Sequence, residues 1–586
     1  MGTSVQAKTV LVLGAGINGA AVARELVLSG VSVIVVDSDD VACGATAWST
    51  RLVHGGLRYL EYGEVGLVRE SLAERERLVR LAGHLVEPLP FYIPLERRSG
   101  GMLAAGARLA GWTGLARRLA AGGTRGSWTV GVGLTLYDLL ASGSRWPRHR
   151  MLRAGGAGLP AVDSRRFPLA ATYTDAQMLY PERFTVELLL DAAAAAAQRG
   201  VEFAVLPHHA VRSDSRGGFL LEPRTAAGEA REIRPDAVVN ASGAWVDQTR
   251  LSVPLAAGGH RRIGGTKGSH LVLDAARLRP LLCDYGVYAE ASDGRPIFVL
   301  PFGRRLVLVG TTDLPFEGDP RDARTDDAEI DYLLKAAATI FPAAPPTRGE
   351  VMQHYCGVRP LPYVPPGTPP GAITRRHLFL REPQAPLPTW SIVGGKLTTC
   401  RSLAEESAAE LLGCLGLPVI ATSADRPLPG APGPGGGELD RLAARLRDGG
   451  LDRDGADAAL SRYGLLAEGF LAERTGGGGS GGNGRAIATI GRTGLPLAAV
   501  ARGIEREWAA TLEDVIERRL MLVFDPALDI NALREVAREM ARLGRLEEDA
   551  VDSETARVAA DLANRYGRRL ADTPAAAVAA GGGGDG

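Results

Sequence analysis

The sequence predicts an α/β protein with a second, largely antiparallel sheet and an all-helical C-terminal domain. Three observations predict this fold: a strand–helix–strand pattern over residues 8–37, a series of short apolar strands between residues 252 and 375, and a Pro/Gly-rich linker followed by helical periodicity. With 586 residues the chain is too long for a single core, since one domain rarely exceeds roughly 250–300 residues.

The first strand–helix–strand unit carries a glycine pattern. Gly14, Gly16 and Gly19 form GxGxxG between the apolar strand of residues 8–13 and a helix to about residue 29, and Asp37 ends the next strand. Such glycines let a pyrophosphate approach the helix N-terminus, and the carboxylate accepts hydrogen bonds from ribose hydroxyls. The sequence therefore predicts a Rossmann-like dinucleotide-binding domain.

The later elements suggest that this domain is discontinuous. Helical patterns cover residues 64–83 and 183–200, residues 209–232 are typical of a hairpin or meander, and apolar strands near 233–243 and 390–400 resume the first sheet. We expect residues 1–94, 165–250 and 376–425 to form the cofactor domain and residues 95–164 and 251–375 a substrate or cap domain. A linker at 426–438, a helical domain at 439–572 and a disordered tail at 573–586 complete the chain.

Composition excludes several classes of protein. Lys plus Arg and Asp plus Glu each total 67, so there is no basic field to hold nucleic acid. Five cysteines without CxxC spacing indicate neither a disulfide framework nor a metal site and favour a reducing cytoplasm. We expect no signal peptide and no spanning helix. Residues 102–121 are apolar and basic, and we weigh peripheral membrane docking against a buried cap over the active site.

Several separated motifs carry a family resemblance. They are STRLVHGGLRYLEYGE (49–64), NASGAW (240–245), KGSH (267–270), GTTD (310–313), GVRPL (357–361), AITR (372–375) and GGKLTTCR (394–401). In this order they resemble the FAD-dependent glycerol-3-phosphate dehydrogenases, within the D-amino-acid-oxidase-like flavoproteins. The resemblance spans most of residues 8–410.

The resemblance implies non-covalent FAD and oxidation of sn-glycerol 3-phosphate to dihydroxyacetone phosphate, by hydride transfer from C2 to the flavin N5. It implies a membrane quinone as electron acceptor and a peripheral site on the inner face of the cell membrane. An oxidase that uses dioxygen and makes hydrogen peroxide is the alternative. The oligomeric state is left open, with a homodimer as one alternative.

The motifs also supply candidate site residues. We expect the phosphate of the substrate to bind Arg58, Arg359 and Arg375, with Tyr59 and Thr311 as hydroxyl partners, and the catalytic residues to be His54, Arg359 and Lys396. His54 is a candidate base for the C2 hydroxyl, because the ordinary pKa of histidine, about 6.5, suits proton transfer. A structural histidine is the alternative. Lys396, one of only four lysines, would lie near the flavin pyrimidine ring.

The expected cofactor-binding residues come from the same motifs and the glycine turn. Lys267 and His270 are assigned to structure or to substrate without preference, and no metal ligand is expected. The cofactor set is Gly14, Gly16, Ile17, Asn18, Gly19, Asp37, Thr46, Ser49, Thr50, Gly55, Gly56, Ser242, Gly243, Gly394, Gly395, Lys396, Leu397 and Thr398.

Overall fold

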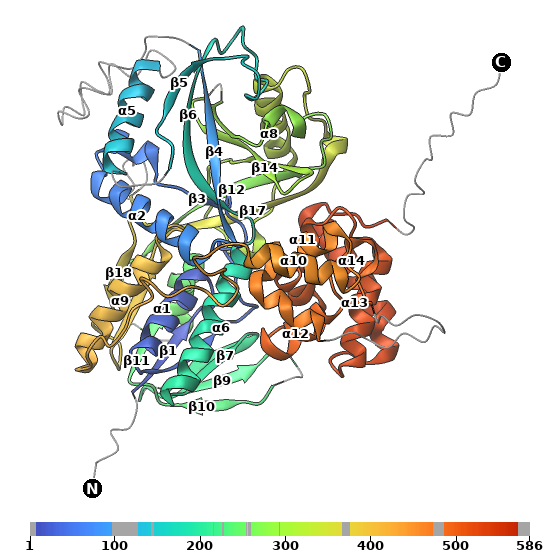
Figure 1. The fold of residues 1–586 in the computed structure, drawn as a ribbon. Coiled ribbons are helices and arrows are strands. Elements are labelled where there is room, and N and C mark those ends of the chain that lie inside the picture. The colour runs from blue at the N-terminus through green and yellow to red at the C-terminus, as the bar shows by residue number, and fades with distance from the viewer. Residues whose placement is uncertain are drawn as a thin grey trace, which may run out of the picture.

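The structure, a computed structural model, has three parts: a mainly parallel sheet with helices, a large mixed sheet, and a C-terminal group of helices (Figure 1). It describes residues 8–571 except 97–126, 142–145, 215, 226–227, 254, 256–259, 292, 366–375 and 473–485. The α/β fold class with an added helical domain is confirmed. The apolar and basic segment 102–121, the tail at 573–586 and Arg375 lie outside the described residues.

The first sheet has the strand order β18-β19-β11-β1-β2-β7 and is parallel except for β18. Its central strands are continuous apolar runs because both faces are buried, one by helices and the other by a small antiparallel sheet. The strands are β1 (Thr9–Leu13), β2 (Ser32–Val36), β7 (Phe203–Leu206), β11 (Ala237–Asn240), β18 (Leu378–Arg381) and β19 (Thr389–Val393). Helices α1 (Ile17–Leu28), α6 (Pro181–Arg199) and α9 (Cys400–Leu415) pack together beside this sheet.

A small antiparallel sheet follows β7. Its strands are β8 (His209–Ser213), β9 (Phe219–Pro223) and β10 (Arg231–Ile233), in the order β10-β9-β8. This is the meander expected from the sequence. Its apolar side packs against the face of the first sheet opposite the helices, where Phe219 and Leu221 share a core with Leu11 of β1 and Ile34 of β2.

The second sheet has ten strands, and it takes in segments that we expected elsewhere. β4 (Val86–Leu95), β6 (Leu169–Met178) and the short β3 (Leu52–Val53) pair within it rather than with the first sheet. The sequence pattern does not show this pairing. β4 lies between two helical patterns, and its ten-residue antiparallel partner β6 is distant in the chain.

The other strands of the second sheet come from one continuous stretch of chain, apart from β5. They are β5 (Arg150–Arg153), β12 (Ile263–Leu273), β13 (Gly286–Glu290), β14 (Pro296–Phe302), β15 (Leu306–Gly310), β16 (Leu314–Pro315) and β17 (Val351–Pro362). Helices α2 (Val65–Leu81), α5 (Ser127–Leu140), α7 (Val246–Ser252) and α8 (Asp327–Ile340) accompany the two large sheets.

The C-terminal helices are joined to the rest by a continuous apolar core. Phe524 and Tyr566 belong to the same buried cluster as Phe302 and Tyr355 of the second sheet. The preceding linker is itself packed, since the Gly430 N–H donates to Glu187 of α6 at 3.0 Å. The helices are α10 (Glu438–Asp448), α11 (Arg453–Tyr463), α12 (Ala498–Arg506), α13 (Ile530–Arg542) and α14 (Val551–Tyr566).

The first prediction concerns a buried charge that joins helices of the first sheet to the linker. Asp191 of α6 accepts from Arg24 of α1 and from Arg426, each at 2.7 Å, and Arg24 and Asp191 are 3% and 5% exposed. Asp191→Asn leaves both guanidinium groups without a counter-charge and is expected to cost about 3–5 kcal/mol of stability. Calorimetric unfolding of the variant measures this loss.

The control is the exposed pair of Arg80 with Asp425, whose side chains are 56% and 84% exposed. Asp425→Asn is expected to change stability by no more than about 1 kcal/mol, because water screens the pair. Equal losses in the two variants would contradict the role given to burial.

Candidate functional site

A cavity of about 560 Å³ lies at the carboxyl ends of the parallel strands. Its walls come from the β1–α1 turn, the loop of residues 37–51, the turn after β11, the segment after β19, and strands β12 and β17 of the second sheet. Ligands of open α/β sheets bind at this edge. The cavity therefore joins both large sheets.

Most of the expected cofactor residues line this cavity. Those that do are Gly14, Gly16, Ile17, Asn18, Asp37, Thr46, Ser49, Thr50, Ser242, Gly243, Gly394, Gly395, Lys396, Leu397 and Thr398. Gly19, Gly55 and Gly56 do not. A Cβ on Gly19 would lie 1.9 Å from the Gly14 carbonyl oxygen, and one on Gly55 would lie 2.2 Å from the Tyr137 hydroxyl. These two glycines permit close packing of the chain.

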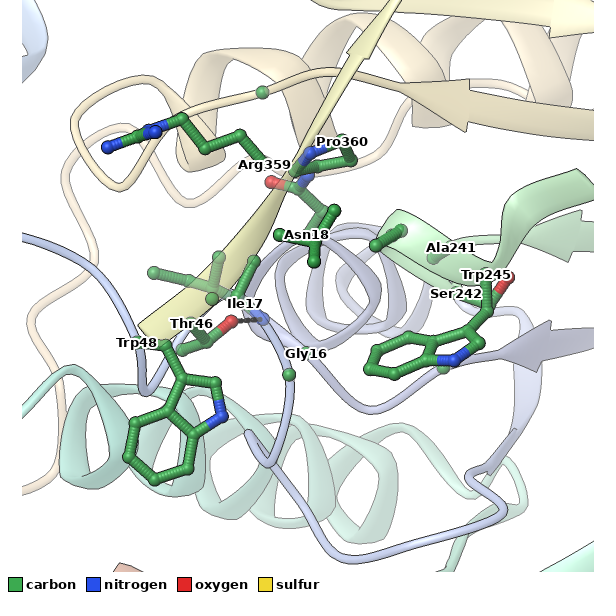
Figure 2. Close-up of a pocket in the computed structure, with 18 of the residues that line it drawn as sticks. Gly16, Ile17, Asn18, Thr46, Trp48, Ala241, Ser242, Trp245, Arg359 and Pro360 are labelled. Carbon is green, nitrogen blue, oxygen red and sulfur yellow. Dashed lines mark hydrogen bonds between the residues drawn. The ribbon is translucent and has the colours of Figure 1, made fainter. Parts of the chain in front are cut away.

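The turn between β1 and α1 forms the centre of the cavity wall. Figure 2 shows Trp48 and Trp245 on either side of the turn that carries Gly16 and Ile17. The Ile17 N–H donates to the Thr46 hydroxyl at 3.1 Å, which ties the 37–51 loop to the start of α1. A helix N-terminus carries partial positive charge, so this wall suits a pyrophosphate.

Asp37 is held in place beside this turn. Its carboxylate accepts from the Ala15 N–H at 2.7 Å and from the Asp39 N–H at 3.0 Å. Burial raises the pKa of Asp37 to about 6, against the lowering effect of these two bonds. The carboxylate lines the same cavity as Val211 of β8, and the hydroxyls of a ribose bound there would donate hydrogen bonds to it.

Two further features fit a dinucleotide. Gly16 has only the Thr46 hydroxyl, at 3.4 Å, near the place where a Cβ would stand, so the protein itself does not need glycine there. The side-chain amide oxygen (Oδ1) of Asn18 is buried in the cavity wall and has no hydrogen-bond partner among the described residues. Both features leave room and a polar group for a bound ligand.

The opposite end of the cavity gathers the expected catalytic residues His54 and Lys396. The Lys396 ammonium lies 3.8 Å from the centre of the Tyr59 ring, a cation–π contact. The Thr398 hydroxyl accepts from the His54 N–H at 3.0 Å, which holds the two motifs together. Burial lowers the pKa of His54 to about 4; the Asp175 carboxylate opposes this shift and the Lys396 ammonium adds to it.

Strands β12 and β17 bring His270 and Arg359 to the same cavity. Arg359 donates to Asp313 at 3.0 Å and to the Thr311 hydroxyl at 2.9 Å. His270 stacks on Tyr355 with ring centres 5.0 Å apart, and its Nε2 is hydrogen-bonded to the Thr50 hydroxyl at 2.9 Å. Burial, with Arg359 and Arg51 nearby, lowers the pKa of His270 well below its usual value. Both imidazoles are therefore neutral at pH 7.

The expected phosphate-binding residues are brought together only in part. Tyr59 and Arg359 line the cavity, whereas Thr311 supports Arg359 without lining it, and Arg58 is half-buried outside the wall. The structure places Arg376 in the wall, next to Arg375, which is not described. The sequence analysis did not predict Arg376, because the AITR motif ends one residue earlier, at Arg375.

Lys267 and the aromatic wall complete the comparison with the sequence. Lys267 binds Glu329 and the Arg324 carbonyl, each at 2.8 Å, which indicates a structural role. His270 lines the cavity, where its side chain also bonds the Thr50 hydroxyl. Trp48 and Trp245 were missed, although Trp245 ends the NASGAW motif and Trp48 precedes Ser49.

The chain is similar to known proteins over most of its length. Residues 9–380 match the family model of the FAD dependent oxidoreductases (DAO). A glycerol-3-phosphate dehydrogenase of Synechocystis sp. is 37% identical over 443 residues, covering 72% of this chain and 73% of that protein. A D-erythritol 1-phosphate dehydrogenase of Brucella abortus is 31% identical over 519 residues, covering 87% and 93%.

A solved structure supports the fold. The X-ray structure of the glycerol-3-phosphate dehydrogenase of Bacillus halodurans, complexed with FAD, superposes with a TM-score of 0.68 and covers 96% of this chain and 95% of that one. At 24% identity this likeness concerns the fold alone.

The second prediction separates a ligand glycine from a packing glycine. Gly16→Ala is expected to leave the unfolding temperature of the cofactor-free protein nearly unchanged and to weaken FAD binding at least about tenfold, because the added methyl group enters the pyrophosphate space. Fluorescence titration with FAD measures the affinity. Gly19→Ala is the contrasting variant, expected to destabilise the cofactor-free protein. If both variants lose only stability, Gly16 does not face the cofactor.

The third prediction uses the lowered pKa of His54. The unfolded chain protonates this residue near pH 6.5 and the folded chain near pH 4, so between these values the unfolded state binds more protons. Stability should therefore fall as the pH falls from 6.5 to 4, by up to about 3 kcal/mol from this residue. His54→Gln should flatten the pH dependence in this window. His270 contributes in the same direction, so some slope remains. An unchanged slope would contradict a neutral, buried His54.

Proposed function

Because the chain belongs to the family of FAD dependent oxidoreductases, we propose that it oxidises sn-glycerol 3-phosphate to dihydroxyacetone phosphate. FAD is its cofactor, bound without a covalent link. The observation that carries the proposal is the set of residues at one end of the cavity, where the cations Lys396 and Arg359 and the neutral imidazoles His54 and His270 line a shared space.

Substrate binding relies on a preset guanidinium. Arg359 is fixed by Asp313 and Thr311 before any substrate arrives, so little ordering of this side chain is needed. A charge-assisted hydrogen bond to a phosphate contributes about 1.5–3 kcal/mol. Arg376 supplies a second guanidinium in the wall, and the family resemblance adds Arg58 and Arg375 as candidates.

Proton removal from the C2 hydroxyl is assigned to His54. With its pKa lowered to about 4, the imidazole is neutral at pH 7 and able to accept a proton. The Thr398 hydroxyl fixes the backbone of His54, and this sets where the ring enters the cavity. His270 is a second neutral imidazole in the same wall, and its Nδ1 has no partner among the described residues. His270 is thus placed to contact the substrate.

Electron transfer requires the cofactor. When bound, FAD supplies the hydride acceptor at the flavin N5. Lys396 holds a positive charge at this end of the cavity, which favours negative charge on the ring beside it.

For the final acceptor we propose a membrane quinone, reached from the inner face of the cell membrane. The supporting surface is formed by α5 and by the segment 146–153 that ends in β5 (Figure 1). The two are joined where the His149 backbone N–H donates to Asp138 of α5 at 3.1 Å. The surface carries the exposed apolar side chains Val132, Leu139 and Met151 and the exposed arginines Arg148, Arg150 and Arg153. Such a mixture is typical of surfaces that rest on anionic lipid. No helix in the described ranges combines the length and apolarity needed to cross a membrane.

A longer phosphorylated polyol is a second candidate substrate. The relative from Brucella abortus, named for D-erythritol 1-phosphate, matches along 93% of its own length, further than the relative from Synechocystis. Both compounds pair a phosphate with an oxidisable alcohol, so the same cations and imidazoles would serve. The two candidates differ in how far the carbon chain extends into the cavity.

The fourth prediction tests both substrate and acceptor. Absorbance of the purified protein near 450 nm, recorded without oxygen, should bleach on addition of sn-glycerol 3-phosphate. Slow recolouring in air and fast recolouring with a soluble quinone indicate a dehydrogenase, whereas fast recolouring in air indicates the oxidase alternative. Bleaching only by D-erythritol 1-phosphate would establish the second candidate. A yellow protein that bleaches with neither compound would refute both substrates and leave FAD binding intact.

The fifth prediction concerns Arg359. Arg359→Met is expected to raise KM for the phosphorylated substrate about 10- to 100-fold, as one charge-assisted contact is lost. Steady-state kinetics with a soluble acceptor measures it. Arg295→Met is the control, since Arg295 is a surface residue paired with Asp293 and should leave KM unchanged. Equal KM values in the two variants would remove Arg359 from the substrate site.

A further inference from the structure

The loop of residues 37–51 connects the cofactor cavity with the C-terminal helices. Between positions 43 and 51 of this loop, eight residues line the cavity: Cys43, Gly44, Ala45, Thr46, Trp48, Ser49, Thr50 and Arg51. The loop contains little regular structure, so its backbone position depends on side-chain contacts. Three sets of these contacts come from the C-terminal helices. They are made by a π-helical turn (Asp514–Arg519), by a short 3-10 helix (Leu522–Phe524) and by Tyr566 of α14.

The first contact is a buried ion pair. Asp40 accepts two parallel hydrogen bonds from Arg519, each 2.7 Å long, and a third from Arg518 at 2.5 Å. The side chains of Asp40 and Arg519 are completely buried. A forked guanidinium–carboxylate pair fixes orientation as well as distance. This pair fixes the position of Asp40, which is three residues along the chain from the cavity residue Asp37.

The second contact lies beside the first. Asp514 binds the His208 imidazole at 2.8 Å and Arg518 at 3.1 Å. The backbone N–H of His208 donates to the backbone carbonyl of Asp39 at 2.9 Å. The backbone N–H of the next residue, His209, donates to the backbone carbonyl of Asp37 at 2.9 Å. The C-terminal residues therefore hold the ribose end of the cavity from both the 37–51 loop and the start of β8.

The third contact is aromatic. The Trp48 ring, which lines the cavity, lies 5.2 Å from the ring of Tyr566 in α14. The Arg51 guanidinium lies over the ring of Phe524 at 4.5 Å. The hydroxyl of Tyr566 donates to Glu517 at 3.0 Å, so its ring is fixed. These contacts hold the second half of the loop.

From these contacts we propose that the C-terminal helices clamp the 37–51 loop, and that the pairing of Asp40 with Arg519 thereby sets the affinity for FAD. Asp40 and Arg519 act as positioning residues, because they act through the loop and line no part of the cavity. This inference goes beyond the proposed function, since it concerns retention of the cofactor whatever the substrate.

The experiment measures FAD affinity in the full-length protein after removal of the cofactor. Arg519→Met removes the forked contact and is expected to raise the FAD dissociation constant at least about tenfold, measured by quenching of flavin fluorescence. Tyr566→Leu is a milder variant that removes the ring beside Trp48, and the dissociation constant should rise several-fold. This variant keeps the proposal testable if Arg519→Met does not fold.

The matched control is Arg183→Met. Arg183 pairs with Glu507 in an equally buried ion pair that joins α6 to the C-terminal helices. It also donates to the backbone carbonyl of Arg519 at 3.4 Å, so its loss loosens the same region but leaves the side-chain pair of Arg519 with Asp40 in place. Glu507 keeps Arg502 as partner at 2.8 Å. This variant should lose thermal stability while its dissociation constant stays within about twofold of the parent.

The comparison decides between clamping and general stability. The proposal is supported if Arg519→Met or Tyr566→Leu weakens FAD binding more than Arg183→Met does at a similar loss of unfolding temperature. If affinity follows the unfolding temperature alone in all the variants, the clamp is overturned. Because no substrate is used, this result is independent of whether the protein oxidises glycerol 3-phosphate.

Discussion

The parallel pairing of β1 with β2 on one side and β11 on the other is the constraint on which the site depends. In-register pairing brings Leu13 beside Val36 and beside Asn240, so the turns that follow these strands meet at one edge. The approach is so close that a Cβ on Gly14 would lie 2.6 Å from the Ala241 carbonyl oxygen. Since α1 starts at this point, its N-terminus, Asp37 and Ser242 all face one cavity.

Burial of charge determines the chemistry of this cavity. The imidazoles of His54 and His270 are kept neutral by burial and by neighbouring cations, whereas the guanidinium groups of Arg51 and Arg359 are each paired with a carboxylate. Arg51, for example, forms a completely buried pair with Glu182 at 2.7 Å. A neutral base beside fixed positive charge suits the oxidation of an alcohol that carries a phosphate.

The two sheets and the C-terminal helices work as one unit around the cofactor space. A line of aromatic contacts runs from Tyr566 through Trp48 and Tyr355 to His270 in the substrate wall. Because protein interiors are close-packed, each ring in this line restricts the movement of the next. The C-terminal helices are thus part of the framework that shapes the site, although they line none of the cavity.

The sequence by itself determined the first strand–helix–strand unit, the glycine turn, Asp37 and the meander after β7. These features follow from local periodicity and short spacings, which physical rules tie directly to backbone shape. The resemblance added the proposed substrate and, from its motifs, candidate residues such as His54, Arg359 and Lys396 that line the cavity. Only the tertiary structure decided that Gly55 serves packing against Tyr137, that Arg376 rather than Arg58 lines the wall, and that β4 and β6 belong to the second sheet. Each of these depends on contacts between residues distant in the chain, such as Thr50 with His270, which local patterns do not encode.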